Sequence, residues 1–461
     1  MTAYSPITPA IRAELKARLS PGALITEPAR LEDYAGDASC LRHLPELVVC
    51  AHSVADVQTL LTLANTHRFP VTPRGGGSGL AGACLADRGG VVLSTRGLDA
   101  IRAIDTINFT MEVEAGAISL RVREAAAARG LFYPPDPAGM ELSTIGGNAA
   151  TDAGGPACVK YGTTRDYILG LEAVLPDGSL ITTGVRTRKG VVGYDLTNLL
   201  VGCEGTLAVI TALTLKLLPK PAATTGVLCA FGSMADAMRA VARVMAEGHL
   251  PSAIEFLDYR CLALIGEMLP FAVPGERPSL LIVELDGPAA PIEAEMAEVV
   301  AVMTREGATR VLRARDEAER QQIWQVRRQV SLRIHDHAAL YLSEDVVVPL
   351  SAIATLVDAL AAHEARHGVE IFAFGHAGDG NIHLNITSQH PDHQERMDRV
   401  AEELLRLVLD LGGTISGEHG IGLAKRPFLP LELAPGSIDL QRRIKALFDP
   451  NQILNPGKIF P

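Results

Sequence analysis

The chain has 461 residues, more than a single hydrophobic core organises, so two domains of about 200 residues each are expected. Hydrophobic residues make up 48% of the sequence and aromatic residues only 4%, as in a well-packed, soluble globular protein. The net charge of -11 argues against a nucleic-acid partner, and no apolar stretch reaches the ~18 residues that would span a membrane.

The seven cysteines are scattered singly, without a C-x-x-C pair. An odd number at such wide spacing is typical of reduced thiols and not of a disulfide framework. The same spacing excludes a ferredoxin-type iron–sulfur cluster held by this chain alone. The residues after Met1 show no basic region followed by an apolar run, so export is not expected and a cytoplasmic location is favoured.

Helices and strands alternate through the first half of the chain. Helices are predicted over 9–19, from a cap at Ser53 through residue 64, and over 120–129. The predicted strands cover 46–50, 70–73, 90–94, 111–116, 169–175 and 180–183. Pro219-Lys220-Pro221 interrupts this pattern and marks the predicted domain boundary.

The second half again mixes the two element types. Strands are predicted over 226–231, 253–258, 280–285, 370–374 and 381–386, with helices over 234–247 and 292–306. Helices packed on one face of a mainly antiparallel sheet fit this order better than a parallel barrel. The predicted fold class is therefore α+β.

A glycine-rich segment follows the strand at 70–73. Gly77-Ser-Gly-Leu-Ala-Gly82 matches the G-x-G-x-x-G pattern of dinucleotide-binding folds, and Asp99 falls near the spacing of a ribose-binding acid. The segment after Gly82 is too short for the crossover helix of such a fold, so we reject the NAD interpretation. Consecutive glycine amides can instead line a nest for a pyrophosphate, with Arg74 and Ser78 as further donors. The alternative is a flexible surface loop.

Two further motifs lie near the C-terminus. If His376 pairs with Asn381 across a tight loop, period-2 alternation puts His383 on the same face of the hairpin. Together with Glu418, the two histidines form a three-ligand set for a divalent metal, and His419 would be an adjacent base. The alternative is a hairpin whose histidines are structural.

These motifs together resemble a known family of flavoproteins. Arg74-Gly-Gly-Gly-Ser-Gly, Thr144-Ile-Gly-Gly-Asn, Glu204-Gly-Thr and the two C-terminal motifs are similar to the FAD-linked D-2-hydroxy acid dehydrogenases of the vanillyl-alcohol oxidase type. That family includes D-lactate dehydrogenases, D-2-hydroxyglutarate dehydrogenase and the glycolate oxidase flavoprotein subunit. The resemblance implies a two-lobed FAD-binding domain (1–219), an α+β cap domain with a mainly antiparallel sheet (220–430) and a C-terminal tail that returns to the FAD domain (431–461).

The resemblance also implies which residues bind FAD. The pyrophosphate would lie on the amides of 75–79, and the flavin ring and ribityl chain would lie along the segments from Pro135 to Gly155. Gly205 and Ile210 would face the adenine side, and Asn455 would approach the ring from the tail. The complete predicted set is Arg74, Gly75, Gly76, Gly77, Ser78, Gly79, Pro135, Ser143, Thr144, Gly146, Gly147, Asn148, Gly154, Gly155, Glu204, Gly205, Ile210 and Asn455. Because the glycine loop has no histidine, non-covalent FAD is expected.

The substrate segment of the family resembles residues 324–331 here. By that resemblance Arg327 would bind the substrate carboxylate as a bidentate fork, and Ser331 stands where a hydroxyl residue is usual. Dicarboxylate-specific relatives carry a lysine where this chain has Ser343, and no lysine occurs between Lys220 and Lys425. The difference favours D-lactate or glycolate. The alternative is D-2-hydroxyglutarate, with Arg328, Arg333 or Lys425 in place of that lysine.

The expected reaction is FAD-dependent oxidation of a D-2-hydroxy acid, assisted by zinc or manganese bound to His376, His383 and Glu418, with His419 as the base. Electrons would pass to an external acceptor, which is an iron–sulfur subunit, an electron-transfer flavoprotein or a quinone. A partner of this kind could hold the chain at the inner membrane, and a homodimer is compatible with the sequence. The alternatives are an oxidase that uses O2, a subunit that mainly docks an iron–sulfur partner, and a flavin-free metallohydrolase.

Overall fold

The structure is a computed structural model that describes residues 4–187 and 189–461. The chain forms two compact units. The first comprises the residues up to Gly154, Thr163–Lys220 and Glu418–Pro461, and the second comprises Gly155–Gly162 and Pro221–Gly417. Compactness alone assigns no function to either unit, so the functional domains 1–219, 220–430 and 431–461 stay a prediction.

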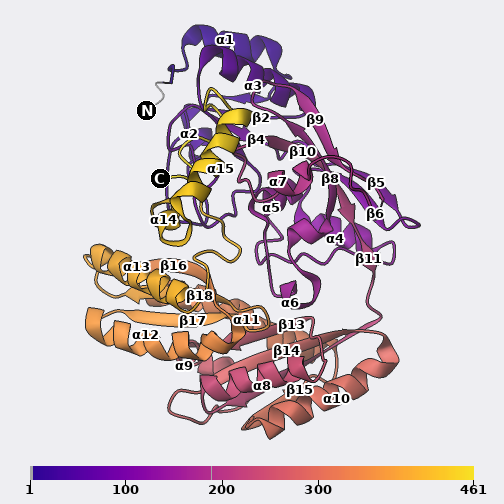
Figure 1. Cartoon of the computed structure of the whole chain (residues 1–461), viewed down its shortest axis with the longest axis vertical. Helices are drawn as coiled ribbons and strands as arrows, with labels where there is room; N and C mark the ends of the chain where they lie inside the picture. Colours follow the sequence, from indigo (N-terminus) through magenta and orange to yellow (C-terminus); the bar gives the residue numbers. More distant parts are fainter. Residues whose placement is uncertain (1–3, 188) are drawn as a thin grey trace. The chain divides into compact units, whose positions relative to one another are not determined.

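The first unit contains a four-stranded sheet in the order β1-β2-β4-β3. Figure 1 labels β2 and β4 of this sheet. Its strands are β1 (Leu24–Ile25), β2 (Leu47–Cys50), β4 (Val91–Ser94) and β3 (Val71–Arg74). β4 pairs in parallel with both β2 and β3. Helices α1 (Pro9–Arg18) and α3 (Val54–His67) share one hydrophobic core with this sheet. The predicted cap is confirmed, because Ser53 and Asp56 form a capping box at the start of α3.

A second, five-stranded antiparallel sheet completes the core of the first unit. Its order is β5 (Ile101–Asp105), β6 (Thr110–Glu114), β10 (Val209–Lys216), β8 (Ile168–Val174) and β9 (Leu180–Gly184). The edge strand β5 was not predicted, because none of its side chains is buried and it lacks the usual alternation. The other helices of this unit include α4 (Ser119–Ala127), α5 (Ile145–Thr151), α7 (Leu196–Leu200), α14 (Leu429–Glu432) and α15 (Pro435–Phe448).

The second unit is built on a seven-stranded sheet in which every neighbouring pair is antiparallel, as predicted. Its order is β15 (Arg310–Arg313), β12 (Ala223–Phe231), β14 (Ser279–Gly287), β13 (Ala253–Leu257), β17 (Glu370–His376), β18 (Asn381–Ser388) and β16 (Leu340–Val347). The mixture of helices with mainly antiparallel sheets confirms the α+β class.

Helices cover both faces of this sheet, so the prediction of one covered face is wrong. On one face, α9 (Tyr259–Ile265) and α11 (Glu317–His337) share a hydrophobic core with Leu228, Ala230, Phe372 and Phe374. Four longer helices also pack on the strands: α8 (Met234–Ala246), α10 (Ala289–Arg305), α12 (Ile353–His367) and α13 (Gln394–Asp410). Consecutive buried apolar residues in β12 and β14 are the sequence signal of a strand buried on both sides.

Among the described residues, none of the helices combines the length and the apolar character required to cross a membrane.

Candidate active site

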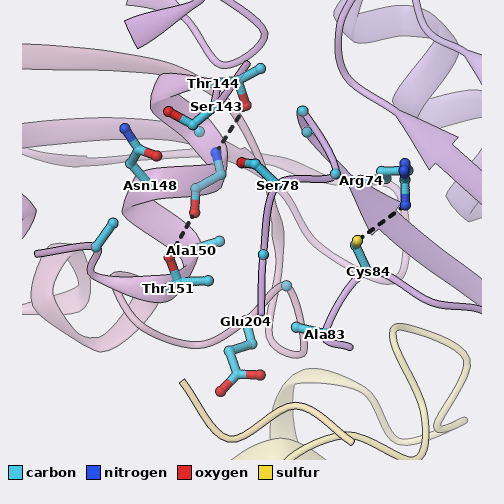
Figure 2. Close-up of a pocket in the computed structure, with 18 of the residues that line it drawn as sticks. Arg74, Ser78, Ala83, Cys84, Ser143, Thr144, Asn148, Ala150, Thr151 and Glu204 are labelled. Atoms are coloured by element: carbon cyan, nitrogen blue, oxygen red, sulfur yellow. Dashed lines mark hydrogen bonds between the residues drawn. The ribbon is translucent and has the colours of Figure 1, made fainter. Parts of the chain in front are cut away.

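The first unit contains an open cavity (Figure 2). Most of its lining comes from the glycine loop 73–80, the segment 137–154, the segment 204–210, and the pair Glu418 and His419. The cavity therefore lies where the glycine loop meets motifs that are distant from it in sequence.

The glycine loop packs directly against the segment that begins α5. A β-carbon on Gly75 would lie 2.4 Å from Thr144 Oγ1, and one on Gly76 would lie 2.1 Å from the carbonyl oxygen of Leu142. Gly77 adopts φ +71°, a conformation that favours glycine. Larger residues at these positions would separate the two walls, so the glycines are required by close approach and not by loop flexibility.

Fifteen of the eighteen residues predicted to bind FAD line this one cavity. They are Arg74, Gly75, Gly76, Gly77, Ser78, Gly79, Ser143, Thr144, Gly146, Gly147, Asn148, Gly154, Glu204, Gly205 and Ile210. The other three, Pro135, Gly155 and Asn455, are not among the lining residues. The Asn455 side-chain amide instead donates to the carbonyl oxygens of Ala83 (2.9 Å) and Glu204 (2.6 Å), which fixes the tail to the cavity wall.

The Arg74 side chain forms bonds within the protein. It donates from Nη2 to the carbonyl oxygen of Gly36 (2.8 Å) and from Nη1 to Cys84 Sγ (3.3 Å). Burial raises the pKa of the Cys84 thiol to about 11. Asp37 and Cys84 also line the cavity, and sequence reasoning missed both because neither belongs to a motif. A direct role for the Arg74 guanidinium in cofactor binding stays a prediction.

Glu204 holds the segment that follows His419. Its carboxylate accepts from the amides of Ile421 (2.7 Å) and Gly422 (2.8 Å), and Figure 2 shows the side chain directed toward the C-terminal segment. Burial raises the pKa of Glu204, although the two amides favour the charged form. His419 Nε2 lies 3.9 Å from Glu418 Oε1. The predicted base and its acidic neighbour therefore line the cavity on a turn that Glu204 positions.

The second unit contains the predicted histidine hairpin. His376 pairs with Asn381, and Phe374 pairs with His383, which confirms the predicted register. The two imidazole centroids are 5.3 Å apart and nearly perpendicular, and both side chains are buried. Asp345 lies directly opposite His383 on β16, with its Oδ1 3.8 Å from His383 Nδ1.

A buried carboxylate that sequence reasoning missed links two of the predicted site residues. Glu255 on β13 is opposite His376 in the sheet; its Oε1 lies 2.5 Å from His376 Nδ1, and its Oε2 accepts from Arg327 Nε at 2.6 Å. Burial alone would raise the pKa of Glu255, but the charges of His376 and Arg327 lower it to about 2. A lone carboxylate in the otherwise apolar strand Ala253–Leu257 was the available signal.

Arg327 lies on α11 with its guanidinium 4.5 Å from the centre of the Phe374 ring. The Nε of Arg327 donates to Glu255. Arg327 would therefore bind a substrate carboxylate through its two Nη groups. Ser331 follows one helical turn later and is exposed. Trp324, in the same predicted segment, donates from Nε1 to Glu284 Oε2 at 2.7 Å, so its position has a structural explanation.

The residues that line the cavity fit FAD, and two of the three predicted metal ligands have the chemistry of metal-binding histidines. Because glycines line the cavity, a pyrophosphate could come close to their backbone amides and bind to them. His376 and His383 are buried nitrogen donors, and a carboxylate on the second ring nitrogen, as Glu255 provides for His376, is typical of metal-bound histidine. The third predicted ligand, Glu418, belongs to the first unit.

Comparison with known families assigns both parts of the chain. The model for "FAD linked oxidases, C-terminal domain" matches residues 220–459, and the model for "FAD binding domain" matches residues 45–184. The chain belongs to the FAD-linked oxidases. It is therefore an FAD-dependent oxidoreductase.

Named relatives of this FAD-linked oxidase cover nearly its whole length. It is 38% identical to the glycolate oxidase subunit GlcD of Bacillus subtilis, over 93% of the chain and 92% of the relative. It is 39% identical to the D-lactate dehydrogenase of Archaeoglobus fulgidus, over 90% of the chain and 91% of the relative.

Solved structures confirm the vanillyl-alcohol oxidase type of fold. A p-cresol methylhydroxylase matches with a TM-score of 0.78 at 19% identity, over 97% of this chain and 95% of its own. A 4-ethylphenol oxidase from Gulosibacter chungangensis matches with a TM-score of 0.76 at 16% identity, over 97% of this chain and 96% of its own. At these identities the likeness concerns the fold alone.

Proposed function

We propose that this FAD-linked oxidase oxidises a short 2-hydroxy acid, either D-lactate or the achiral glycolate, to the 2-oxo acid. The observation that carries the proposal is the buried Glu255, which joins the carboxylate-binding candidate Arg327 to the metal-ligand candidate His376. Arg327 and His376 were predicted separately, and their shared bonds to the buried Glu255 place them in one polar cluster. The names of the relatives, glycolate oxidase subunit and D-lactate dehydrogenase, support the substrate class.

Each proposed role falls to a residue that was predicted from the sequence. Arg327 binds the substrate carboxylate, and His419 removes the hydroxyl proton. His376, His383 and Glu418 would hold zinc or manganese. When bound, FAD supplies a two-electron acceptor and the divalent cation supplies a Lewis acid for the substrate oxygens. Loss of one proton and one hydride converts the hydroxy acid to the oxo acid.

The proposal of a monocarboxylate rests on Ser343. This residue lies on β16 opposite Asn385, where dicarboxylate-specific relatives carry a lysine. Without that cation, a second carboxylate on the substrate would lose its expected counter-charge. D-2-hydroxyglutarate is therefore proposed to be a poorer substrate than D-lactate or glycolate.

We further propose an external electron acceptor, which is an iron–sulfur subunit, an electron-transfer flavoprotein or a quinone. The Bacillus subtilis relative is named as a subunit, which favours a protein partner. Direct reduction of O2 is the alternative, and an oxygen electrode separates the two. An oxidase would consume O2 with its substrate, whereas a dehydrogenase would need an added acceptor dye.

Anaerobic bleaching of the flavin tests the proposed reaction. The purified protein is mixed with D-lactate, L-lactate, glycolate, D-2-hydroxyglutarate and L-2-hydroxyglutarate, and the flavin absorbance is followed. D-lactate or glycolate should bleach it fastest, and L-lactate should leave it oxidised. If none of the five acids reduces the flavin, the chain does not act on this class of substrate.

The FAD should be dissociable. The glycine loop from Gly75 to Gly79 contains no histidine or cysteine that could bond to the flavin ring. Acid precipitation of the purified protein should therefore leave the yellow chromophore in the supernatant. A yellow pellet would show a covalent bond to the protein.

Replacing Arg327 by lysine should raise the Michaelis constant for the substrate by at least tenfold. A charge-assisted hydrogen bond contributes ~1.5–3 kcal/mol. The single ammonium group of lysine cannot bond to Glu255 and to the substrate carboxylate with the planar geometry of a guanidinium. The bound FAD should be unchanged, because its cavity belongs to the first unit. Steady-state kinetics with D-lactate or glycolate measure the effect.

The matched control is Arg328→Lys. Arg328 is the next residue on α11, is exposed, and donates to Gln321 Oε1 at 3.2 Å. Its replacement should leave the Michaelis constant within about twofold. Equal constants in the two variants would place Arg327 outside the substrate site.

A further inference from the structure

Helices α12 and α13 bring together three side chains that the proposed reaction does not use. His363 and His367 lie one turn apart at the end of α12, and Glu403 lies on the neighbouring helix α13. Residues at positions i and i+4 of a helix point to the same side, so both imidazoles face the same point on α13. The arrangement is a two-histidine, one-carboxylate set within a single compact unit.

One carboxylate oxygen is the centre of this cluster. Glu403 Oε2 lies 3.0 Å from His363 Nδ1 and 3.1 Å from His367 Nε2. The two histidine side chains are only 15% and 14% exposed, whereas Glu403 is 36% exposed and can adjust. Three potential ligand atoms therefore converge from two helices onto one partly buried point.

The spacing of these atoms agrees with a tetrahedral metal site. Zinc takes histidine nitrogen and carboxylate oxygen at about 2.0–2.1 Å, which separates neighbouring ligand atoms by about 3.3 Å. The observed separations from Glu403 Oε2 are close to that value. His367 is also the last residue of α12, where the helix dipole favours a cation.

We propose that His363, His367 and Glu403 bind a divalent transition-metal ion of the zinc class. Three protein ligands leave a fourth position for water. The ion would join α12 to α13, and these helices pack on β17, β18 and β16, the strands that carry His376, His383 and Asp345. It would be a site separate from the proposed catalytic metal, and it does not depend on the proposed function.

Arg366 is the competing cation at this cluster. Its Nη1 lies 3.3 Å from the same Glu403 oxygen, but its side chain is 63% exposed and its pairing is with a surface carboxylate. Exposed pairs of this kind contribute little, so Arg366 can turn to solvent when a metal ion binds. Without a metal, the two histidines and Arg366 would satisfy Glu403 as hydrogen-bond and ion-pair partners.

Zinc titration of the full chain tests the proposal. The metal-depleted wild-type protein and the double variant His363→Asn/His367→Asn compete for zinc with a chromophoric chelator. The variant should bind one equivalent fewer than the wild type, whatever the occupancy of other sites. Zinc in ~100-fold excess over its dissociation constant should raise the Tm of the wild type by about 5 °C more than that of the variant.

Single substitutions on α13 provide the matched control. Glu403→Gln should weaken the zinc site at least tenfold, whereas Glu402→Gln should not, because Glu402 pairs with Arg406. The far-ultraviolet circular dichroism spectrum should be unchanged in every variant, which verifies folding. Equal zinc equivalents in the wild type and the double variant would overturn the proposal, as would equal weakening by Glu402→Gln and Glu403→Gln. His390, Asp392 and His393 form another group of potential ligands. If a His390→Asn/His393→Asn variant loses one zinc equivalent and the His363→Asn/His367→Asn variant loses none, the proposal is also overturned.

Discussion

Replacing His419 by asparagine should slow the reduction of the flavin by substrate ~100-fold or more in a single turnover. His419 lines the cavity predicted for FAD, and in the proposed reaction it takes the hydroxyl proton. Asparagine fits the same space but cannot accept that proton. The flavin spectrum and the metal content should be unchanged. The pH profile of flavin reduction should lose its acidic limb, because the group that must be neutral is absent.

The matched control for this experiment is His67→Asn. His67 also lies in the first unit beside a carboxylate, with its Nε2 3.0 Å from Glu14 Oε2, but it is not among the residues that line the cavity. Its replacement should leave flavin reduction unchanged. If His419→Asn instead loses metal while His383→Asn retains it, His419 is a ligand and the base is another residue.

Replacing Glu255 by glutamine should reduce both stability and substrate binding. The substitution leaves Arg327 and His376 without their buried counter-charge, and breaking a buried ion pair in this way costs about 3 kcal/mol. Arg327 would also lose the bond that orients its fork, so the Michaelis constant should rise at least tenfold. Urea unfolding and steady-state kinetics measure the two effects.

Glu284→Gln separates these two effects. Glu284 is a partly buried carboxylate on β14 of the same sheet and is bonded to Arg320 and to Trp324 Nε1. Its loss should also destabilise the unit, but the Michaelis constant should not change. If both variants raise the constant equally, the effect comes from general loss of stability and Glu255 has no positioning role.

Local patterns predicted much of the candidate site. The hairpin register follows from the spacing of His376, Asn381 and His383, because side chains alternate along paired strands. The glycine loop follows from composition, because Gly75 and Gly76 are required where two segments approach closely. Each of these inferences depends on residues that are near one another in sequence.

Contacts between distant segments were not predictable in the same way. Glu255 lies 121 residues from His376 and 72 residues from Arg327, and nothing local indicates that β13 pairs with β17. Glu204 was assigned to cofactor binding from its motif, yet its carboxylate accepts from amides 217 and 218 residues away. The family resemblance located the motifs but not these partners.

The sequence by itself determined the family, the α+β class and the residue types available for chemistry, because these depend on motifs, on periodicity and on composition. Only the tertiary structure decided which charges neutralise one another and which faces are buried. Strand order and helix packing bring together residues that are distant along the chain. For this reason the Glu255 cluster and the His363–His367–Glu403 cluster became apparent only in the folded chain.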